Sequence, residues 1–427
     1  MNKEQINKFI KDGLVSTTDA DGNGLQLYHY TQNFKPSVID DTLLKKCRGI
    51  VYHGDTQILD TFQYTDEFMH EDYDAISKYM GDFGNWDFYE SYEGTLIRMF
   101  YFNGEWYIST HRRLDAFKSK WSSSKSFGQL FVDALEEENV SNKVFSENLP
   151  PGDNILERFE ATLDKDKQYM FLVCNNKENR IVCDAPQFPK VFHVGSFVEG
   201  VVNLDDDMNI TRHRKLSFDT LYDLVSYVDK MNYMEKQGVI GFSKDGRNMK
   251  VVHQQYAKLT NVRGNQQSIK FRYLQVRNDP EMQSMLCNLY PEYMNHFKDY
   301  EDTLYNVATC IHHGYMERFI NKNVCTLPQN QYKILRLCHE WYINEKKQGQ
   351  GNYRYRPRVT INVVLSIMNE QTPSVLNNLI KTYKNPALHK NTKTPEELGL
   401  VHKSNNVPIP PPIPPPIPPP IETLNRS

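Results

Sequence analysis

A group of basic and aromatic side chains between residues 111 and 125 has the residue types and spacing that bind phosphates. The group consists of His111, Arg112, Arg113, Lys118, Lys120 and Lys125, with Phe117 and Trp121 among them. Cationic side chains contact a nucleic-acid backbone, and aromatic rings stack on its bases. The solvated end of a hairpin explains the same residues equally well. Arg112, Arg113 and Lys118 are therefore candidate RNA-binding residues.

Two other groups favour ordinary structural roles. His312 and His313 have no third ligand at metal spacing, so no metal site is predicted there. The basic run from Arg212 to Lys215 is typical of a polar loop. The 7 cysteines are odd in number and form no C-x-x-C pair, which favours a reduced intracellular setting.

The composition of the chain limits the kinds of partner that the basic and aromatic side chains of residues 111–125 can bind. The 427 residues suggest two or three domains, and 39% hydrophobic content is enough for a core. The 50 basic and 53 acidic residues give a net charge of −3, so nucleic-acid binding requires a local basic patch. We expect no membrane association, since no long apolar run occurs, and the residues from Met1 to Lys8 are too polar for a secretory signal.

Strand patterns dominate the sequence up to about residue 270. Asn103-Gly104 predicts a hairpin that pairs residues 95–102 with 105–110. Further strands are expected at 49–52, 168–174, 179–183, 190–196, 237–243 and 248–253. From about 270 to 395 apolar residues recur at helical spacing, with a polar loop at 344–358.

The sequence ends in a repeat of proline and isoleucine from Pro408 to Ile421. Proline fixes φ and has no amide donor, so this tract is expected to be a solvated polyproline II segment outside the core. It also contains P-x-x-P spacing, which an aromatic groove such as that of an SH3 or WW domain binds. Both interpretations of the tail remain open.

An ordered series of motifs runs through residues 40–265. Its members are Lys46-Cys-Arg-Gly49, Ser91-Tyr-Glu-Gly-Thr95, Asn179-Arg-Ile-Val182, Gln237-Gly-Val-Ile240 and Met249-Lys-Val-Val252. The series resembles the adenylyltransferase domain of phage-type (T-even) ATP-dependent RNA ligases of the RNA ligase 1 branch. The resemblance implies an α+β fold: a nucleotidyltransferase domain of twisted, largely antiparallel sheets over 1–268, an all-helical domain over 269–400, and a disordered tail over 401–427.

Enzymes of that family work by covalent catalysis. A lysine attacks the α-phosphate of ATP, and the AMP passes to an RNA 5′-phosphate before a 3′-hydroxyl displaces it. Carboxylates hold Mg²⁺ against the phosphates, and further lysines neutralise the transferring group. The resemblance therefore implies ATP and Mg²⁺ as cofactors, RNA as partner, and a pocket between the sheets.

The first motifs match the family only in part. Arg48 and the glycine after it are present, which makes Arg48 a candidate nucleotide-binding residue. The motif K-x-D/E-G-S/T reads Ser91-Tyr-Glu-Gly-Thr95, so Glu93 and Gly94 match while Ser91 stands where the nucleophilic lysine belongs. Serine is a poor substitute without a general base.

The later motifs lack further chemical groups. Counting back from Asn179 places the family's first glutamate at Val173, and the motif E-G-V-V begins with Gln237. In K-x-K, Lys250 is retained and Val252 replaces the second lysine. Ser91, Glu93 and Lys250 are thus the candidate catalytic positions, and Val173 and Gln237 join Arg48 and Gly94 as candidate nucleotide-binding positions.

Two nearby residues could compensate for these losses. Lys46 fits a bare K-x-x-G spacing, although its flanks match the family's upstream element and such spacing is common by chance. Glu235 would share a strand face with residue 237 if that segment is extended. The leading hypothesis is a ligase-like protein that binds RNA or nucleotide without adenylyl transfer. The alternative is an active ligase with a relocated nucleophile. The resemblance also fits a viral origin, hence a host-cell cytoplasmic location.

Overall fold

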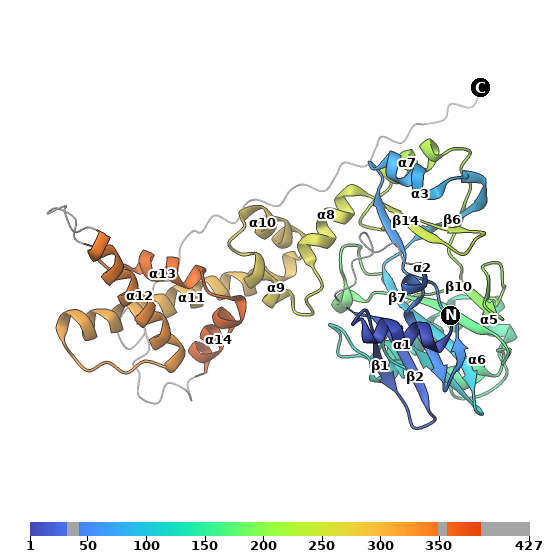
Figure 1. Ribbon diagram of the computed structural model, residues 1–427, viewed down its shortest axis with the longest axis horizontal. Helices are drawn as coiled ribbons and strands as arrows, with labels where there is room; N and C mark the ends of the chain where they lie inside the picture. The colour runs from blue at the N-terminus through green and yellow to red at the C-terminus, as the bar shows by residue number, and fades with distance from the viewer. Residues whose placement is uncertain (32–41, 349–356, 386–427) are drawn as a thin grey trace. The chain divides into compact units, whose positions relative to one another are not determined.

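The computed structural model describes residues 1–31, 42–348 and 357–385 (Figure 1). The chain divides after Asn261 into two compact units. The first contains three sheets with helices against them, and the described part of the second is helical. The α+β class with largely antiparallel sheets followed by helices is therefore confirmed.

A four-stranded antiparallel sheet forms from the N-terminal segment in the order β1-β2-β3-β4. Its strands are β1 (Val15–Ala20), β2 (Leu25–Tyr30), β3 (Arg48–His53) and β4 (Thr56–Leu59), preceded by α1 (Lys3–Lys11) and accompanied by α2 (Thr42–Lys46). The apolar residues Ile6 and Phe9 of α1 pack against Tyr28 and Tyr52 of the sheet. This apolar contact holds α1 against the sheet, although the helix is rich in lysine.

A second sheet has the order β11-β10-β9-β7-β8. It consists of β7 (Gly94–Phe102), β8 (Glu105–Ser109), β9 (Gln168–Cys174), β10 (Val191–Val198) and β11 (Val201–Asn203). Three helices pack on one of its faces: α4 (Phe127–Ser141), α5 (Lys143–Asn148) and α6 (Ile155–Glu160). Phe131 of α4, Phe159 of α6 and Phe171 of β9 are fully buried at this contact.

The third sheet carries most of the motif residues and has the order β12-β6-β13-β14-β5. Its strands are β5 (Asp66–Met69), β6 (Trp86–Ser91), β12 (Lys215–Leu216), β13 (Gly238–Ser243) and β14 (Asn248–Val252). Strands β5 and β14 are parallel, unlike the other pairs. The helices α3 (Tyr73–Met80) and α7 (Leu221–Lys230) cover one face, and the other face contributes Tyr89 and Phe242 to a core shared with the first two sheets.

The hairpin expected at Asn103-Gly104 is confirmed. Phe102 pairs with Glu105, and both turn residues have positive φ (51° and 96°), as a two-residue hairpin turn requires. The strands at 168–174, 190–196, 237–243 and 248–253 are also confirmed within a residue or two. The strand expected at 179–183 is wrong, because this segment folds around the Glu93 side chain instead.

Several helices of the first unit were not expected from its strand-rich pattern. The longest is α4, whose buried residues include Leu130, Phe131, Ala134 and Leu135 at helical spacing. Its start has a capping box, with the Ser126 side chain bonded to the Gln129 amide and the Gln129 side chain bonded back to Ser126. The sequence Ser-x-x-Gln before an apolar run was thus the signal that could have located this helix.

The second unit begins within α8 (Gln254–Arg263) and continues through α9 (Ile269–Val276), α10 (Pro280–Leu289), α11 (Met294–Tyr315), α12 (Gln329–Gln348), α13 (Ile361–Asn369) and α14 (Pro373–Lys384). Leu286, Ile334 and Leu335 are buried, as their helical spacing predicts. The polar loop expected from residue 344 is wrong at its start, since α12 continues to Gln348. The proline-rich tail lies outside the described residues.

Two absences concern only the described part of the chain. Those residues contain no group of three or more His, Cys, Asp or Glu side chains that could hold a metal ion. None of the helices described has both the length and the apolar character that a membrane-crossing segment requires. The His312 ring instead bonds to the backbone carbonyl of Val359 through Nε2, at 3.2 Å.

Candidate functional site

Three motif positions that are far apart in sequence meet at one side chain, Gln237. Its Oε1 accepts a hydrogen bond from Ser91 Oγ at 3.2 Å and another from Lys250 Nζ at 2.8 Å. Ser91 ends β6, Gln237 immediately precedes β13, and Lys250 lies in β14, so three adjacent strands position the group. Ser91 and Gln237 are buried, and the backbone N–H of Gln237 also donates to the backbone carbonyl of Ser91 at 2.9 Å.

A carboxylate completes this group from the edge strand. Glu67 pairs in register with Lys250 across the parallel β5–β14 contact, and its Oε1 lies 3.7 Å from Lys250 Nζ. We call Glu67, Ser91, Gln237 and Lys250 the Gln237 cluster. Val252 follows Lys250 by two residues on β14, so its side chain lies on the same face, where the family has its second lysine.

Glu93, the retained acid of the nucleophile motif, is occupied by backbone amides. Its carboxylate accepts hydrogen bonds from the amides of Ile181 (3.2 Å), Val182 (2.7 Å) and Cys183 (3.1 Å). Burial raises the pKa of Glu93 although these three amides favour the charged form. Glu93 therefore holds the segment after Asn179 in place, and it has little remaining capacity to bind a metal ion.

Val173 lies on the wrong face of its strand to contact a nucleotide with the Gln237 cluster. It belongs to the apolar core between β9 and α4, together with Phe171. Side chains alternate along a strand, so Leu172 lies on the opposite face. Leu172 is beside Gly94, where an added Cβ would meet its Cγ at 2.8 Å. Leu172, one residue from the predicted position, is therefore the residue of this pair that lies on the face of Gly94.

Arg48 lies in a second group of charged residues, which we call the cationic cluster. Its members are His29, Arg48, Arg98, His111 and Arg112. The rings of His29 and His111 are 5.3 Å apart, and the guanidinium of Arg98 donates to the carbonyls of Gly49 and Thr110. Arg48 Nη1 donates to the Gln63 carbonyl and to Thr65 Oγ1, both at 3.3 Å. Burial lowers the pKa of His111 well below its usual value, and the neighbouring positive charges lower it further.

Two motif glycines have a structural reason for being glycine. Gly49 has a φ of +83°, and an added Cβ would lie 2.6 Å from His111 Cα and 2.8 Å from Arg98 Nη1. At Gly238 an added Cβ would lie 2.8 Å from the Cα of Val252 on the neighbouring strand. These glycines are required for the close approach of backbone segments whether or not the site performs chemistry.

The structure separates the three basic residues predicted to bind RNA. Arg112 is exposed and joins the cationic cluster. Arg113 forms an ion pair with Asp19 at 3.4 Å, and Lys118 forms one with Asp115 at 3.1 Å. Phe117 covers Gly128 at the start of α4. The segment therefore combines local ion pairs with one arginine that faces the buried cations.

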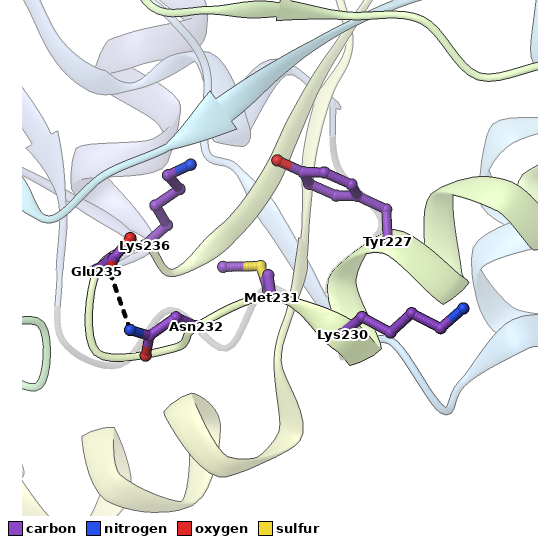
Figure 2. A pocket seen from close by; sticks show the side chains of 6 residues that line it. All are labelled: Tyr227, Lys230, Met231, Asn232, Glu235 and Lys236. Carbon is purple, nitrogen blue, oxygen red and sulfur yellow. Dashed lines mark hydrogen bonds between the residues drawn. The ribbon is translucent and has the colours of Figure 1, made fainter. Parts of the chain in front are cut away.

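The two residues considered as replacements for the lost groups lie elsewhere. Glu235 is in a turn before β13 and accepts a hydrogen bond from Asn232 Nδ2 at 3.0 Å (Figure 2), so the extended geometry on which its expected position depended is absent. It lines a cavity of about 270 Å³ with Tyr227, Lys230 and Lys236. Lys46 ends α2 as an exposed residue.

A buried network around Glu90 was not found by sequence reasoning. Its carboxylate accepts hydrogen bonds from Lys236 Nζ (2.6 Å), Tyr227 Oη (3.1 Å) and the Tyr92 hydroxyl. Burial alone would raise the pKa of Glu90, but these bonds outweigh it and the pKa is lowered. The Tyr92 ring stacks on Phe192 at 4.8 Å. The partners come from separate elements, so no local pattern marks them.

Buried histidines predict a loss of stability in mild acid. Burial lowers the pKa of His29, His193 and His213 to about 4, from an ordinary value of 6.5. The unfolded chain binds more protons between these two values, so stability falls as the pH falls from about 6.5 to 4. Over that pH range, protonation of the unfolded chain at each histidine lowers the free energy of unfolding by up to about 3 kcal/mol.

The measurement is chemical denaturation at pH values from 7.5 to 4. His193→Phe is the informative variant, because the ring is buried and packs beside Phe171, where another aromatic ring can take its place. Its free energy of unfolding should fall less steeply below pH 6.5 than that of the unmodified protein. Identical pH slopes would contradict the assignment for this residue.

Comparisons with known proteins complete the description of the site. No protein-family model matches the chain. It is 28% identical over 420 residues to the immediate-early protein ICP-46 homolog of Invertebrate iridescent virus 6, covering 94% of this chain and 89% of that protein. It is 27% identical to the ICP-46 homolog of Invertebrate iridescent virus 3, covering 71% and 68% of the two chains. Both relatives are viral proteins.

Solved structures give weaker likenesses. A putative ATP-dependent DNA ligase from Aquifex aeolicus has a TM-score of 0.37 and 13% identity, covering 67% of this chain and 71% of that chain. An archaeal ATP-dependent RNA ligase has a TM-score of 0.37 and 11% identity, covering 64% of each chain. The chain is thus similar along nearly its whole length to a viral ICP-46 homolog, and only distantly to solved ligase structures.

Proposed function

We propose that this chain is an RNA ligase-like protein that binds nucleotide or RNA phosphates and does not perform adenylyl transfer. The observation that carries the proposal is the meeting of Ser91, Gln237 and Lys250 in one hydrogen-bonded group. These positions come from three separate ligase motifs. Their convergence supports the arrangement of a ligase pocket without its nucleophile.

The local chemistry supports the loss of covalent catalysis. A serine hydroxyl needs a general base to become a nucleophile. Ser91 Oγ donates to the amide oxygen of Gln237, which does not take up a proton at neutral pH. Lys250 donates to the same oxygen and lies near Glu67, and among the described residues no general base is hydrogen-bonded to Ser91 Oγ.

Phosphate binding has its own support. The cationic cluster places Arg48, Arg98 and Arg112 around two histidines, and Arg112 is exposed to ligands. Guanidinium groups in such an arrangement bind phosphates. The likeness to viral immediate-early proteins supports a role inside an infected host cell. The cationic and aromatic side chains of residues 111–125 make RNA the proposed partner of this segment.

The test is covalent labelling with α-labelled ATP and Mg²⁺. We expect no label to remain on the denatured protein, because Ser91 has no base and Gln237 replaces a carboxylate. The reaction should be monitored by denaturing gel, with an active RNA ligase as positive control. Stable labelling would contradict the proposal, and mapping the label to Lys46 or Lys250 would identify a relocated nucleophile.

A further inference from the structure

The Gln237 cluster and the other motif positions, which together make up the expected pocket, do not fit the Mg²⁺ ion that the ligase family uses. Mg²⁺ prefers carboxylate oxygens. Gln237 offers an amide, and Leu172 and Val173 offer no oxygen from their side chains. Glu93 is saturated by three backbone amides. Within the Gln237 cluster only Glu67 supplies a carboxylate, and its Oε1 lies 3.7 Å from Lys250 Nζ.

Positive charge is concentrated in the cationic cluster. Arg98 is fully buried, and the neighbouring Arg48 charge adds to the effect of burial in lowering the pKa of Arg98 to about 9. Three buried nitrogens of the cationic cluster, His29 Nε2, Arg98 Nε and His111 Nδ1, have no hydrogen-bond partner among the described residues. Of these three, Arg98 Nε can only donate, whereas His29 Nε2 is an acceptor because His29 Nδ1 donates to the Tyr30 carbonyl. A buried unsatisfied donor next to the Arg48 charge is costly unless an anion balances it.

The two clusters adjoin along residues 63–67, because Arg48 Nη1 donates to the Gln63 carbonyl and to Thr65 Oγ1, and Glu67 of the Gln237 cluster follows two residues later. Burial raises the pKa of Tyr64 to about 12, with Glu67 adding to the increase and Arg48 opposing it. Tyr64 is therefore within electrostatic reach of Glu67 of the Gln237 cluster and of Arg48 of the cationic cluster. A ligand with several negative charges could bridge Lys250 and Arg112 across this position.

We propose that the pocket binds the polyphosphate of a nucleotide as a free anion, without a divalent cation, through Arg112, Arg48 and Lys250. The inference rests on the proposed function, since it specifies how the same pocket takes its ligand. Fixed guanidinium and ammonium groups neutralise the phosphates in place of Mg²⁺. Added Mg²⁺ competes with these groups for the phosphate oxygens, so it does not strengthen binding.

The first experiment measures ATP binding to the full chain by calorimetry, once in EDTA and once in excess Mg²⁺. We expect ATP to bind in EDTA at least as tightly as in Mg²⁺, and we expect binding to weaken as salt increases. Inorganic tripolyphosphate should bind under the same conditions, which attributes recognition to the phosphates. Binding that is tighter in Mg²⁺ by about tenfold or more, or no binding in EDTA, would overturn the inference.

Two variants assign the effect to residues. Arg112→Gln should weaken ATP binding in EDTA by about tenfold or more, because it removes a charge-assisted contact. Arg336→Gln, an exposed arginine of α12, is the matched control and should leave binding unchanged. Gln237→Glu adds a carboxylate beside Lys250, so ATP binding should weaken in EDTA and recover in part with Mg²⁺. Equal affinities of Arg112→Gln and the control would contradict the proposed contact.

The outcomes separate this inference from the proposed function. Mg²⁺-dependent ATP binding without covalent labelling would overturn the inference and leave the pseudoenzyme proposal standing. Covalent labelling would overturn the proposed function whatever the cation dependence of binding. Loss of ATP binding with retained RNA binding in a gel-shift assay would restrict the proposed function to RNA phosphates.

Discussion

Replacing Val173 with glutamate is expected to lower the free energy of unfolding by more than about 3 kcal/mol, although glutamate is the residue that the ligase motif has here. The Val173 side chain is 5% exposed in the core between β9 and α4. A carboxylate there would have no polar partner and would be protonated or expelled. Either outcome disrupts packing against Phe131 and Phe171.

Leu172→Glu is the matched control on the adjacent residue. Leu172 is half-buried on the opposite face of β9, beside Gly94. The same change should cost less than half as much there, since the carboxylate can reach solvent. Urea denaturation of both variants measures the difference. Equal costs, or a small cost for Val173→Glu, would show that the two faces of β9 are assigned incorrectly.

The assignment also decides how catalysis could be restored. A variant that combines Ser91→Lys with Gln237→Glu needs a further glutamate as its third change. This glutamate belongs on the face of Leu172, because a glutamate at 173 would lie in the core. Ser91→Lys alone is expected to do little, since an amine without metal ligands lacks support for the transition state.

The second large effect is expected from Glu93→Ala. The change removes the acceptor of three backbone amides, those of Ile181, Val182 and Cys183, and the last two of these residues are buried. We expect a loss of about 4 kcal/mol in the free energy of unfolding. Amide hydrogen exchange should rise first in the segment 179–184, because the carboxylate holds that segment.

Glu93→Gln separates charge from hydrogen bonding. The amide keeps one oxygen for the Val182 and Cys183 amides and presents an NH₂ group to the third donor, so its cost should lie between those of the unmodified protein and Glu93→Ala. Exchange at 181–183 that is unchanged in Glu93→Ala would contradict the structural role and return Glu93 to the list of free carboxylates.

Local chemistry in the sequence was enough to predict much of the first unit's framework. Asn103-Gly104 predicted the hairpin because few residue pairs adopt positive φ twice in succession. Short apolar runs bounded by turn residues predicted β9 and β13. Helical periodicity likewise predicted a second unit of helices. The capping box before α4 carried the same kind of local information and was overlooked.

Tertiary structure alone decided what each motif side chain does. The pairing of Ser91 and Lys250 with Gln237 requires three strands to lie side by side, and nothing in their separate segments specifies that contact. The register of β9 places Val173 in the core and Leu172 beside Gly94, a choice that a one-residue shift would reverse. The sequence by itself determined which chemical groups are present. The tertiary structure determined how they act, because each group's hydrogen-bond partners, burial and neighbouring charges come from residues distant in sequence.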